Sequence, residues 1–152
     1  MFQVKAPPKP SPPPPPRRPN PIVSVGMEVG GYGDVMVGEK ARFKVFLKNA
    51  GKTVARISFP TSQRFELQIS RKGTVVWTWS NSRVFTQAIS EVEIKPGKKL
   101  EFEATWDQTD NNGSPVGPGV YTAKGTVTAM EKWLRLSVDT DFAVVARKSK
   151  PR

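Results

Sequence analysis

The sequence contains no cysteine and no histidine, and these two absences exclude more chemistry than any other feature of its composition. Without histidine there is no imidazole to act as base for a serine nucleophile, and without cysteine there is no thiolate, so the common catalytic triads cannot be assembled. Zinc, haem and iron–sulfur sites lose their preferred ligands, and no disulfide framework can form. We therefore predict no catalytic residues, no metal and no cofactor.

Long hydrophobic runs are also missing from the chain. No stretch of about 18 apolar residues is present, so we expect no membrane span. The start, Met-Phe-Gln-Val-Lys-Ala-Pro-Pro, lacks the apolar core of a secretory signal. We expect a chain without an export address, and a cell-surface location would follow only if an upstream segment had been removed.

The positive charge lies mainly at the two ends of the chain. Lys and Arg number 24 against 13 Asp and Glu, a formal net charge of +11. Residues 1–21 and 147–152 each carry four basic residues and no acid, which leaves 24 − 8 = 16 basic residues against 13 acidic ones between them. A length of 152 residues fits one domain. We predict an arm (1–21), one domain (22–146) and a basic tail (147–152).

The arm is rich in proline, since ten of the 15 prolines lie in residues 7–21. Fixed φ angles and missing N–H groups favour a polyproline II conformation, which reaches on the order of 45 Å at about 3.1 Å per residue. Its simplest role is that of a spacer. Alternatively it docks in an aromatic-lined groove of a partner, with Arg17 and Arg18 orienting it by charge. Nucleic-acid binding is disfavoured, because the basic residues sit on the ends of the chain and not among aromatics on a folded face.

From Ile22 onward the apolar residues recur with period two, and no stretch keeps helical spacing. Turn signals such as Lys72-Gly73 and Pro96-Gly97 separate the alternating stretches. We predict eight or nine short strands, in an all-β, two-sheet antiparallel immunoglobulin-like sandwich with a Pro-rich N-terminal arm. The alternating stretches are 22–29, 41–48, 64–69, 74–79, 92–94, 100–106, 120–129 and 134–146.

Parity along these stretches assigns the aromatic residues to faces. Trp106 shares the apolar face of its strand and is predicted to lie in the core. Val75, Trp77 and Trp79 share one face of a hairpin strand, so we expect all three to pack in the core or between the sheets.

Other aromatics fall on the outer faces and are candidates for partner contact. Trp133 is out of phase with Leu134 and joins Arg135 on the outer side of the last predicted strand. An exposed Trp beside an Arg is a pairing enriched at protein interfaces, although edge packing explains it equally well. Phe46 lies on the polar face of its strand and has the same two interpretations.

The loop Asp107-Gln-Thr-Asp110-Asn-Asn-Gly113 places side-chain oxygens as a calcium loop would. The glycine stands at the seventh position and no glutamate follows at the twelfth, so the spacing departs from that of an EF-hand. Asp107, Asp110, Asn111 and Asn112 are therefore predicted to form a surface turn, and are also candidates for partner contact.

Carboxylates are the remaining candidates for acid–base chemistry. Glu91 and Glu93, like Glu101 and Glu103, alternate on the predicted solvent-facing sides of two strands. No cleft motif accompanies them, so we interpret them as solubilising residues and not as a glycosidase pair.

Four motifs in order resemble the Bacillus intracellular proteinase inhibitor (BsuPI) domain over roughly Ala41 to Ala129. They are Phe59-Pro-Thr-Ser-Gln-Arg-Phe-Glu-Leu, Val84-Phe-Thr-Gln-Ala88, Pro96-Gly97 leading into Phe102 and Trp106, and Gly117-Pro-Gly-Val-Tyr121. The resemblance implies a β-sandwich, inhibition of an intracellular serine protease and a cytoplasmic location. The chain departs from the pattern at Ser62, where we expect glycine, in a longer loop over 107–119 and in the added arm.

The sequence thus favours a non-enzymatic protein-binding sandwich, plausibly a proteinase inhibitor of the BsuPI type. The loops at Ser80–Ser82 and Asp107–Gly119 are the candidates for the protease-binding loop, whereas the matching motifs are interpreted as framework. The alternative is a structural or assembly module whose arm contacts neighbouring subunits. The candidate partners are accordingly a serine protease or copies of the chain itself.

Overall fold

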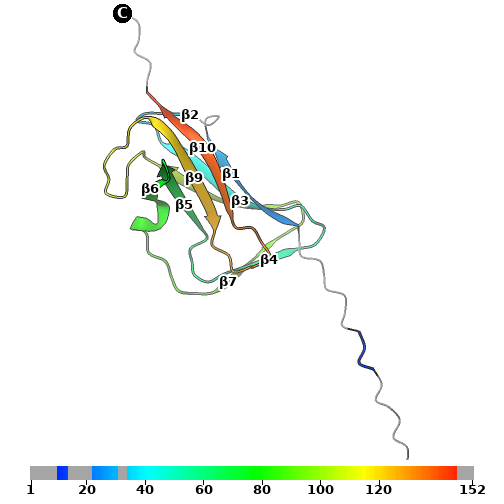
Figure 1. Ribbon diagram of the computed structural model, residues 1–152. Coiled ribbons are helices and arrows are strands. Elements are labelled where there is room, and N and C mark those ends of the chain that lie inside the picture. Colours follow the sequence, from blue (N-terminus) through cyan, green and yellow to red (C-terminus); the bar gives the residue numbers. More distant parts are fainter. Residues whose placement is uncertain (1–9, 14–21, 31–33, 147–152) are drawn as a thin grey trace, which may run out of the picture.

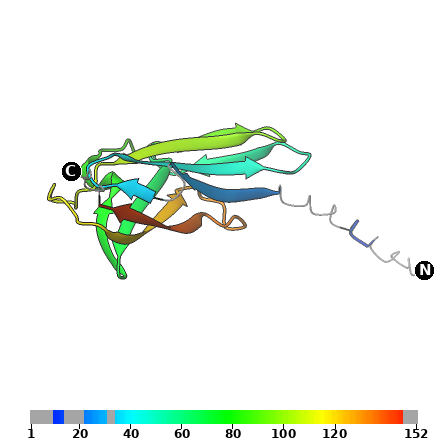
Figure 2. The same cartoon turned by 90° about the horizontal axis from the view of Figure 1, so that it is seen from above.

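A computed structural model describes residues 10–13, 22–30 and 34–146 of the chain (Figure 1). Strands in two layers form the body, with β9 and β10 (orange to red) in one layer and the yellow-green strands β7 and β8 in the other (Figure 2). The first sheet has the order β1-β3-β8 and comprises Val23–Val29, Ala41–Asn49 and Lys99–Trp106. The second has the order β2-β10-β9-β5-β6 and comprises Asp34–Met36, Ser137–Val145, Gly119–Val127, Phe65–Arg71 and Thr74–Thr78.

A short two-stranded ladder and a helical turn complete the described elements. Strands β4 (Ala55–Phe59) and β7 (Ser90–Ile94) pair with each other, and the 3-10 helix η1 (Trp79–Ser82) follows β6. All strand pairs are antiparallel except β2, which runs parallel to β10. The predicted all-β, immunoglobulin-like sandwich is confirmed, with this parallel edge strand and the separate ladder as additions.

The described part of the chain begins with residues 10–13, which are exposed and carry no secondary structure. The rest of the predicted arm, including Arg17 and Arg18, and the basic tail 147–152 lie outside the described residues. Within the described residues no helix has the length and hydrophobicity that a membrane crossing requires.

The core is built by the predicted alternation. Ala41, Phe43, Val45 and Leu47 are buried on β3, while the residues between them face outward. Trp106 is fully buried, as predicted, and its ring lies 5.4 Å from that of Tyr121. Burying one Val, Leu or Phe side chain stabilises the fold by about 1.5–3 kcal/mol. The alternation of apolar residues therefore specifies which face of each strand turns inward.

Tyr121 closes the end of the sandwich where β9 begins. Its hydroxyl donates a hydrogen bond to the carbonyl of Gly117, four residues earlier, at 2.5 Å. This arrangement is the tyrosine corner of immunoglobulin-like domains, which fixes the loop that enters the strand.

Asn49 joins the β3–β8 ladder to the β4–β7 ladder. It is fully buried, and its side-chain amide donates to the carbonyls of Thr53 and Ile94, both at 2.8 Å. Its side-chain oxygen accepts from the Gly51 N–H at 3.0 Å, which forms the turn predicted at the end of β3.

The prediction that Val75 shares a face with Trp77 and Trp79 is wrong. Ile69 pairs with Trp77, but its neighbour Ser70 pairs with Val75, so Val76 is an extra residue at a bulge. A bulge of one residue reverses the alternation beyond it. Val75 is consequently 44% exposed, whereas Trp77 packs partly buried against the core.

Trp79 lies in η1 and not in a strand, because β6 ends at Thr78. Its ring still packs inward, 4.2 Å from that of Phe65, so the predicted inter-sheet packing of this tryptophan is confirmed. The helical turn directs the chain away from the sheet edge and into the segment that connects to β7.

Candidate functional site

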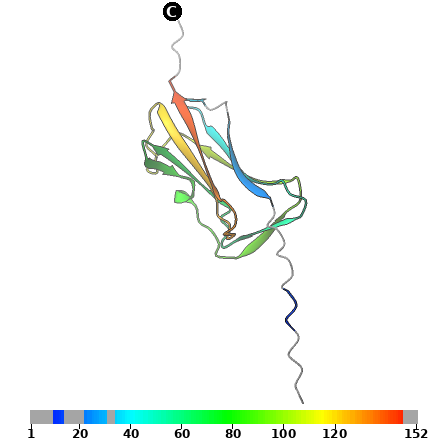
Figure 3. The same cartoon turned by 45° about the vertical axis from the view of Figure 1, so that its right-hand side comes forward.

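The connection between η1 and β7, residues 83–89, is an exposed stretch that we call the crossover segment. It runs along one end of the molecule, from the five-stranded sheet to the β4–β7 ladder (Figures 1 and 3). None of its residues lies in a turn or bend, and only Phe85 is partly buried. Val84 is 98% and Ile89 76% exposed, which places two apolar side chains in solvent.

Thr86 in the middle of the crossover segment is tied to Ser62. The Ser62 N–H donates to the Thr86 carbonyl at 2.9 Å, and the Thr86 N–H donates to the Ser62 hydroxyl at 2.7 Å. Two hydrogen bonds between the same pair restrain both the position and the direction of the backbone.

Trp79 supports the residues that precede Thr86. The guanidinium carbon of Arg83 lies 4.2 Å from the centre of the Trp79 ring, and the Phe85 ring packs against the same tryptophan at 5.8 Å. The Arg83 N–H also donates to the Ser80 carbonyl at 3.0 Å. Arg83 and Phe85 are therefore both held on one aromatic platform, on either side of Val84.

Glu66 holds η1 in place beneath this platform. One carboxylate oxygen accepts from the Ser80 N–H at 3.1 Å, and the other accepts from the Ser80 hydroxyl. The Gln63 amide donates to the same carboxylate at 3.2 Å. Two polar residues of the first resemblance motif thus reach this region, since Ser62 contacts the crossover segment and Glu66 contacts the turn that leads into it.

The backbone of Val84 is free for a partner. In the described part of the chain, neither its N–H nor its carbonyl takes part in an internal hydrogen bond. Extended backbone with unpaired groups is what peptide-binding clefts recognise by strand addition. The crossover segment therefore presents unpaired backbone groups at Val84, while contacts to Ser62 and Trp79 restrain the residues around it.

The two loops that the sequence favoured as protease contacts lie side by side. Residues of η1 and of the loop after β8 line one depression of about 450 Å³, together with Lys40 and Trp77. The Asn111 side chain accepts from the Thr78 N–H at 2.9 Å, and the Asn111 N–H donates to the Val76 carbonyl at 3.0 Å. This loop is consequently folded back onto β6.

The side-chain oxygens of Asp107 and Asp110 accept hydrogen bonds from within this loop. Asp110 accepts from the N–H groups of Asn112 and Ser114, at 2.9 and 3.0 Å, and Asp107 accepts from the Thr109 hydroxyl at 2.6 Å. The predicted surface turn is confirmed by these bonds. No group of three or more acidic side chains in the described ranges is arranged to hold a metal ion.

Phe46 is partly buried on the outer face of its own sheet. Its ring covers Gly26 on the neighbouring strand, where a Cβ atom would lie 2.3 Å from the ring, and the Lys99 ammonium lies 4.6 Å from the ring centre. An aromatic side chain that shields a glycine on the next strand stabilises the sheet. This packing explains why an aromatic residue stands on the outer face of β3. Contact of Phe46 with a partner stays a prediction.

Trp133 and Arg135 are exposed, as their parity predicts, but they precede the strand. Strand β10 begins at Ser137 and not at Leu134, because the Leu134 N–H closes a turn onto the Glu131 carbonyl at 3.5 Å. Trp133 is 39% exposed in this connection from β9 to β10. The structure does not bring these residues together with Phe46, and their role in binding stays a prediction.

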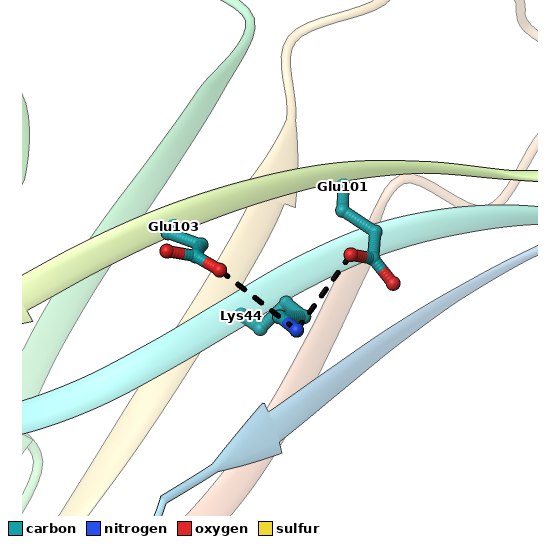
Figure 4. A network of polar contacts seen from close by, with 3 residues as sticks. All are labelled: Lys44, Glu101 and Glu103. Carbon is teal, nitrogen blue, oxygen red and sulfur yellow. Dashed lines mark ion pairs between the residues drawn. The ribbon is translucent and has the colours of Figure 1, made fainter.

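The carboxylates on β8 face solvent as predicted. Lys44 lies between Glu101 and Glu103, with nitrogen–oxygen distances of 3.6 and 3.8 Å (Figure 4). The side chain of Glu103 is 78% exposed. These ion pairs lie on an open sheet face, where such pairs are typically worth 0–1 kcal/mol.

The crossover segment is not among the sites that the sequence predicts. The Val84-Phe-Thr-Gln motif is predicted to be framework, but Val84 and Thr86 are exposed and only Phe85 packs inward. The available signal was the apolar residues Val84 and Ile89 in a stretch without strand alternation, between two predicted strands.

The described chain is a β-sandwich that presents a restrained, exposed segment. The sequence model of the BsuPI family, described as intracellular proteinase inhibitor, matches residues 34–132. The chain belongs to this family. Comparison with curated protein sequences gave no significant match.

Solved structures with similar folds are distant. The CARDB domain of a Pyrococcus furiosus protein, solved in complex with di-metal ions, is 18% identical over 84% of this chain and 96% of that chain, with a TM-score of 0.45. The Bacillus subtilis sporulation control protein Spo0M is 13% identical over 84% of this chain and 50% of that chain, with a TM-score of 0.44. A β-glucosidase from Erythrobacter marinus is 15% identical over 81% of this chain and 15% of that chain, with a TM-score of 0.45. Similarities this distant carry no functional argument.

Proposed function

We propose that this protein is a proteinase inhibitor that acts by binding a serine protease and catalyses no reaction of its own. Family membership supports an inhibitor, and the sequence lacks the histidine and cysteine on which common catalytic triads depend. The crossover segment supplies the surface such an inhibitor needs.

The observation that carries the proposal is the pairing of Thr86 with Ser62. Tight protease inhibitors bind through segments that are already rigid in the free protein, because little conformational entropy is then lost on binding. Thr86 is exposed, yet both of its backbone hydrogen-bonding groups are fixed by Ser62. An exposed and restrained backbone is the combination that distinguishes an inhibitor from a substrate loop.

The loop over 107–119 is less suited to this role. Its backbone groups bond within the loop and to β6, as in the Asp110 N–H to Ser114 carbonyl bond of 2.8 Å. It therefore offers a partner mainly side chains.

The test is an inhibition assay of the full chain against subtilisin as a representative serine protease. We expect competitive inhibition with a dissociation constant in the micromolar range or below. Absence of inhibition at micromolar concentrations across subtilisin, elastase and trypsin would contradict the proposal.

A further inference from the structure

Val84 is the most exposed large hydrophobic residue among those described, at 98% of its surface. Single exposed hydrophobic side chains are common on protein surfaces and need no special role. Val84 differs from exposed strand residues such as Val75 and Val120, because it lies outside the sheets and its own backbone groups have no internal partner among the described residues. Its two neighbours are nevertheless restrained.

The residues on both sides of Val84 are restrained, by Trp79 and by further hydrogen bonds. Arg83 precedes it with extended backbone angles, φ −119° and ψ 150°, and its N–H is bonded to Ser80. Phe85 follows and packs on Trp79, and the next residue is bonded to Ser62. The chain thus presents one apolar side chain from an extended and restrained backbone.

Serine proteases recognise this arrangement in their substrates. A peptide lies extended in the cleft, its backbone forms hydrogen bonds with the enzyme, and one side chain enters the S1 pocket that sets specificity. The unpaired N–H and carbonyl of Val84 are available for those bonds in the described part of the chain.

The geometry points to Val84 as the residue that fills the S1 pocket of the target protease, while the side chains of its neighbours Arg83 and Phe85 stay packed on Trp79. This inference rests on the proposed function. The partner it selects is a serine protease with a small apolar S1 pocket, such as that of elastase, because valine is short, branched and uncharged. A pocket with a carboxylate at its base, as in trypsin, would keep an unpaired buried charge.

The same restraints explain why the segment would inhibit and not simply be cleaved. Attack by the protease serine on the Val84 carbonyl breaks the bond to the Phe85 nitrogen, forms an acyl ester, and passes the serine proton to the new Phe85 amine. Trp79 contacts the Phe85 ring and Ser62 bonds the next residue, Thr86, so the chain that carries the new amine stays in place beside the ester. Attack by the amine then restores the peptide bond and returns the proton to the serine, which competes with hydrolysis.

The test compares full-length variants at Val84 with matched variants at Val120. Val120 is 65% exposed and lies near the start of β9. The Ser62 region lies at the opposite end of this strand, because Thr128, which follows β9, donates a hydrogen bond to Gln63. Inhibition constants are measured against elastase, subtilisin and trypsin. We expect Val84→Asp to weaken inhibition of elastase and subtilisin by at least ~30-fold, the scale of an interface hot spot.

The reciprocal variant Val84→Arg is expected to lose inhibition of elastase. It should inhibit trypsin at least ~10-fold more strongly than the wild type does, because the S1 pocket of trypsin carries a carboxylate. Val120→Asp and Val120→Arg are expected to stay within about twofold of the wild type. Equal melting temperatures show that all variants are folded. If the wild type inhibits but the Val84 variants match it, the inference is wrong and the proposed function stands. If the wild type inhibits none of the three proteases, the proposed function itself is contradicted.

Discussion

Ser62 and Thr86, 24 positions apart in the sequence, exchange two hydrogen bonds, one of them through the Ser62 hydroxyl. They belong to two different motifs of the family resemblance, which this contact brings together in the fold. A glycine at position 62, as the family pattern leads us to expect, would keep the bond from its own N–H and lose the one to the side chain. The serine therefore adds a restraint on the crossover segment.

Replacing Ser62 by alanine removes the hydroxyl acceptor of the Thr86 N–H. The lost bond is worth about 1 kcal/mol, so we expect Ser62→Ala to weaken protease inhibition roughly fivefold. The melting temperature should hardly change, because Thr86 is exposed. Ser24→Ala, at an exposed position of β1, is the matched control. An inhibition constant equal to that of the wild type would show that this restraint does not contribute to binding.

Glu66 is expected to matter for stability as well as for binding. Glu66→Ala leaves the Ser80 N–H and hydroxyl without their acceptor, which costs about 1–3 kcal/mol for a partly buried group. Urea unfolding should show this loss of free energy of unfolding, and inhibition should weaken because η1 supports the crossover segment. Glu66→Gln keeps one acceptor oxygen and should lose less. Equal unfolding free energies for Glu66→Ala and the wild type would contradict a stabilising role of the Glu66–Ser80 hydrogen bonds.

Phe46 is expected to stabilise the sheet without contributing to inhibition. Phe46→Ala uncovers Gly26 and should lower the free energy of unfolding by about 1 kcal/mol. Gly26→Ala forces its new methyl group against the Phe46 ring, so the double variant should lose less stability than the two single losses added together. Thermal unfolding and inhibition are measured for all three. A tenfold loss of inhibition in Phe46→Ala with unchanged stability would instead place Phe46 in the interface.

Deletion of residues 1–21 distinguishes the proposed inhibitor function from the alternative, in which the arm assembles copies of the chain. The family match begins at residue 34 and β1 begins at Val23, so the sandwich and the crossover segment are complete without the arm. We expect the shortened chain to inhibit with an unchanged constant. Light scattering should give both forms the mass of a monomer. A larger mass that depends on residues 1–21 would support assembly through the arm.

Most of the framework could be predicted from the sequence because it depends on alternation. Burial on one face of β3, or of Trp106 on β8, follows directly from a period of two. Val75 was assigned to the wrong face because a single extra residue, Val76, shifts the register of the hairpin. Nothing in the residue types of that strand marks the position of the bulge.

The candidate site was harder to predict because long-range contacts create it. The crossover segment is irregular, so no periodicity describes it, and its restraints come from residues on other elements such as Ser62 and Trp79. The neighbouring loop after β8 was singled out for its length and its Asn and Asp residues, which turn out to bond the loop to itself. Length and composition therefore favoured a loop that is folded onto itself and lies beside η1, which leads into the crossover segment.

The proposed function requires that a protease bind the crossover segment. Hydrogen–deuterium exchange of the full chain, alone and with subtilisin inactivated at its nucleophilic serine, tests it directly. We predict that the amides of Val84 and Phe85, which have no internal partner in the described part of the chain, become protected in the complex. Protection confined to the loop over 107–119 or to the surface around Trp133, with residues 83–89 unchanged, would contradict it.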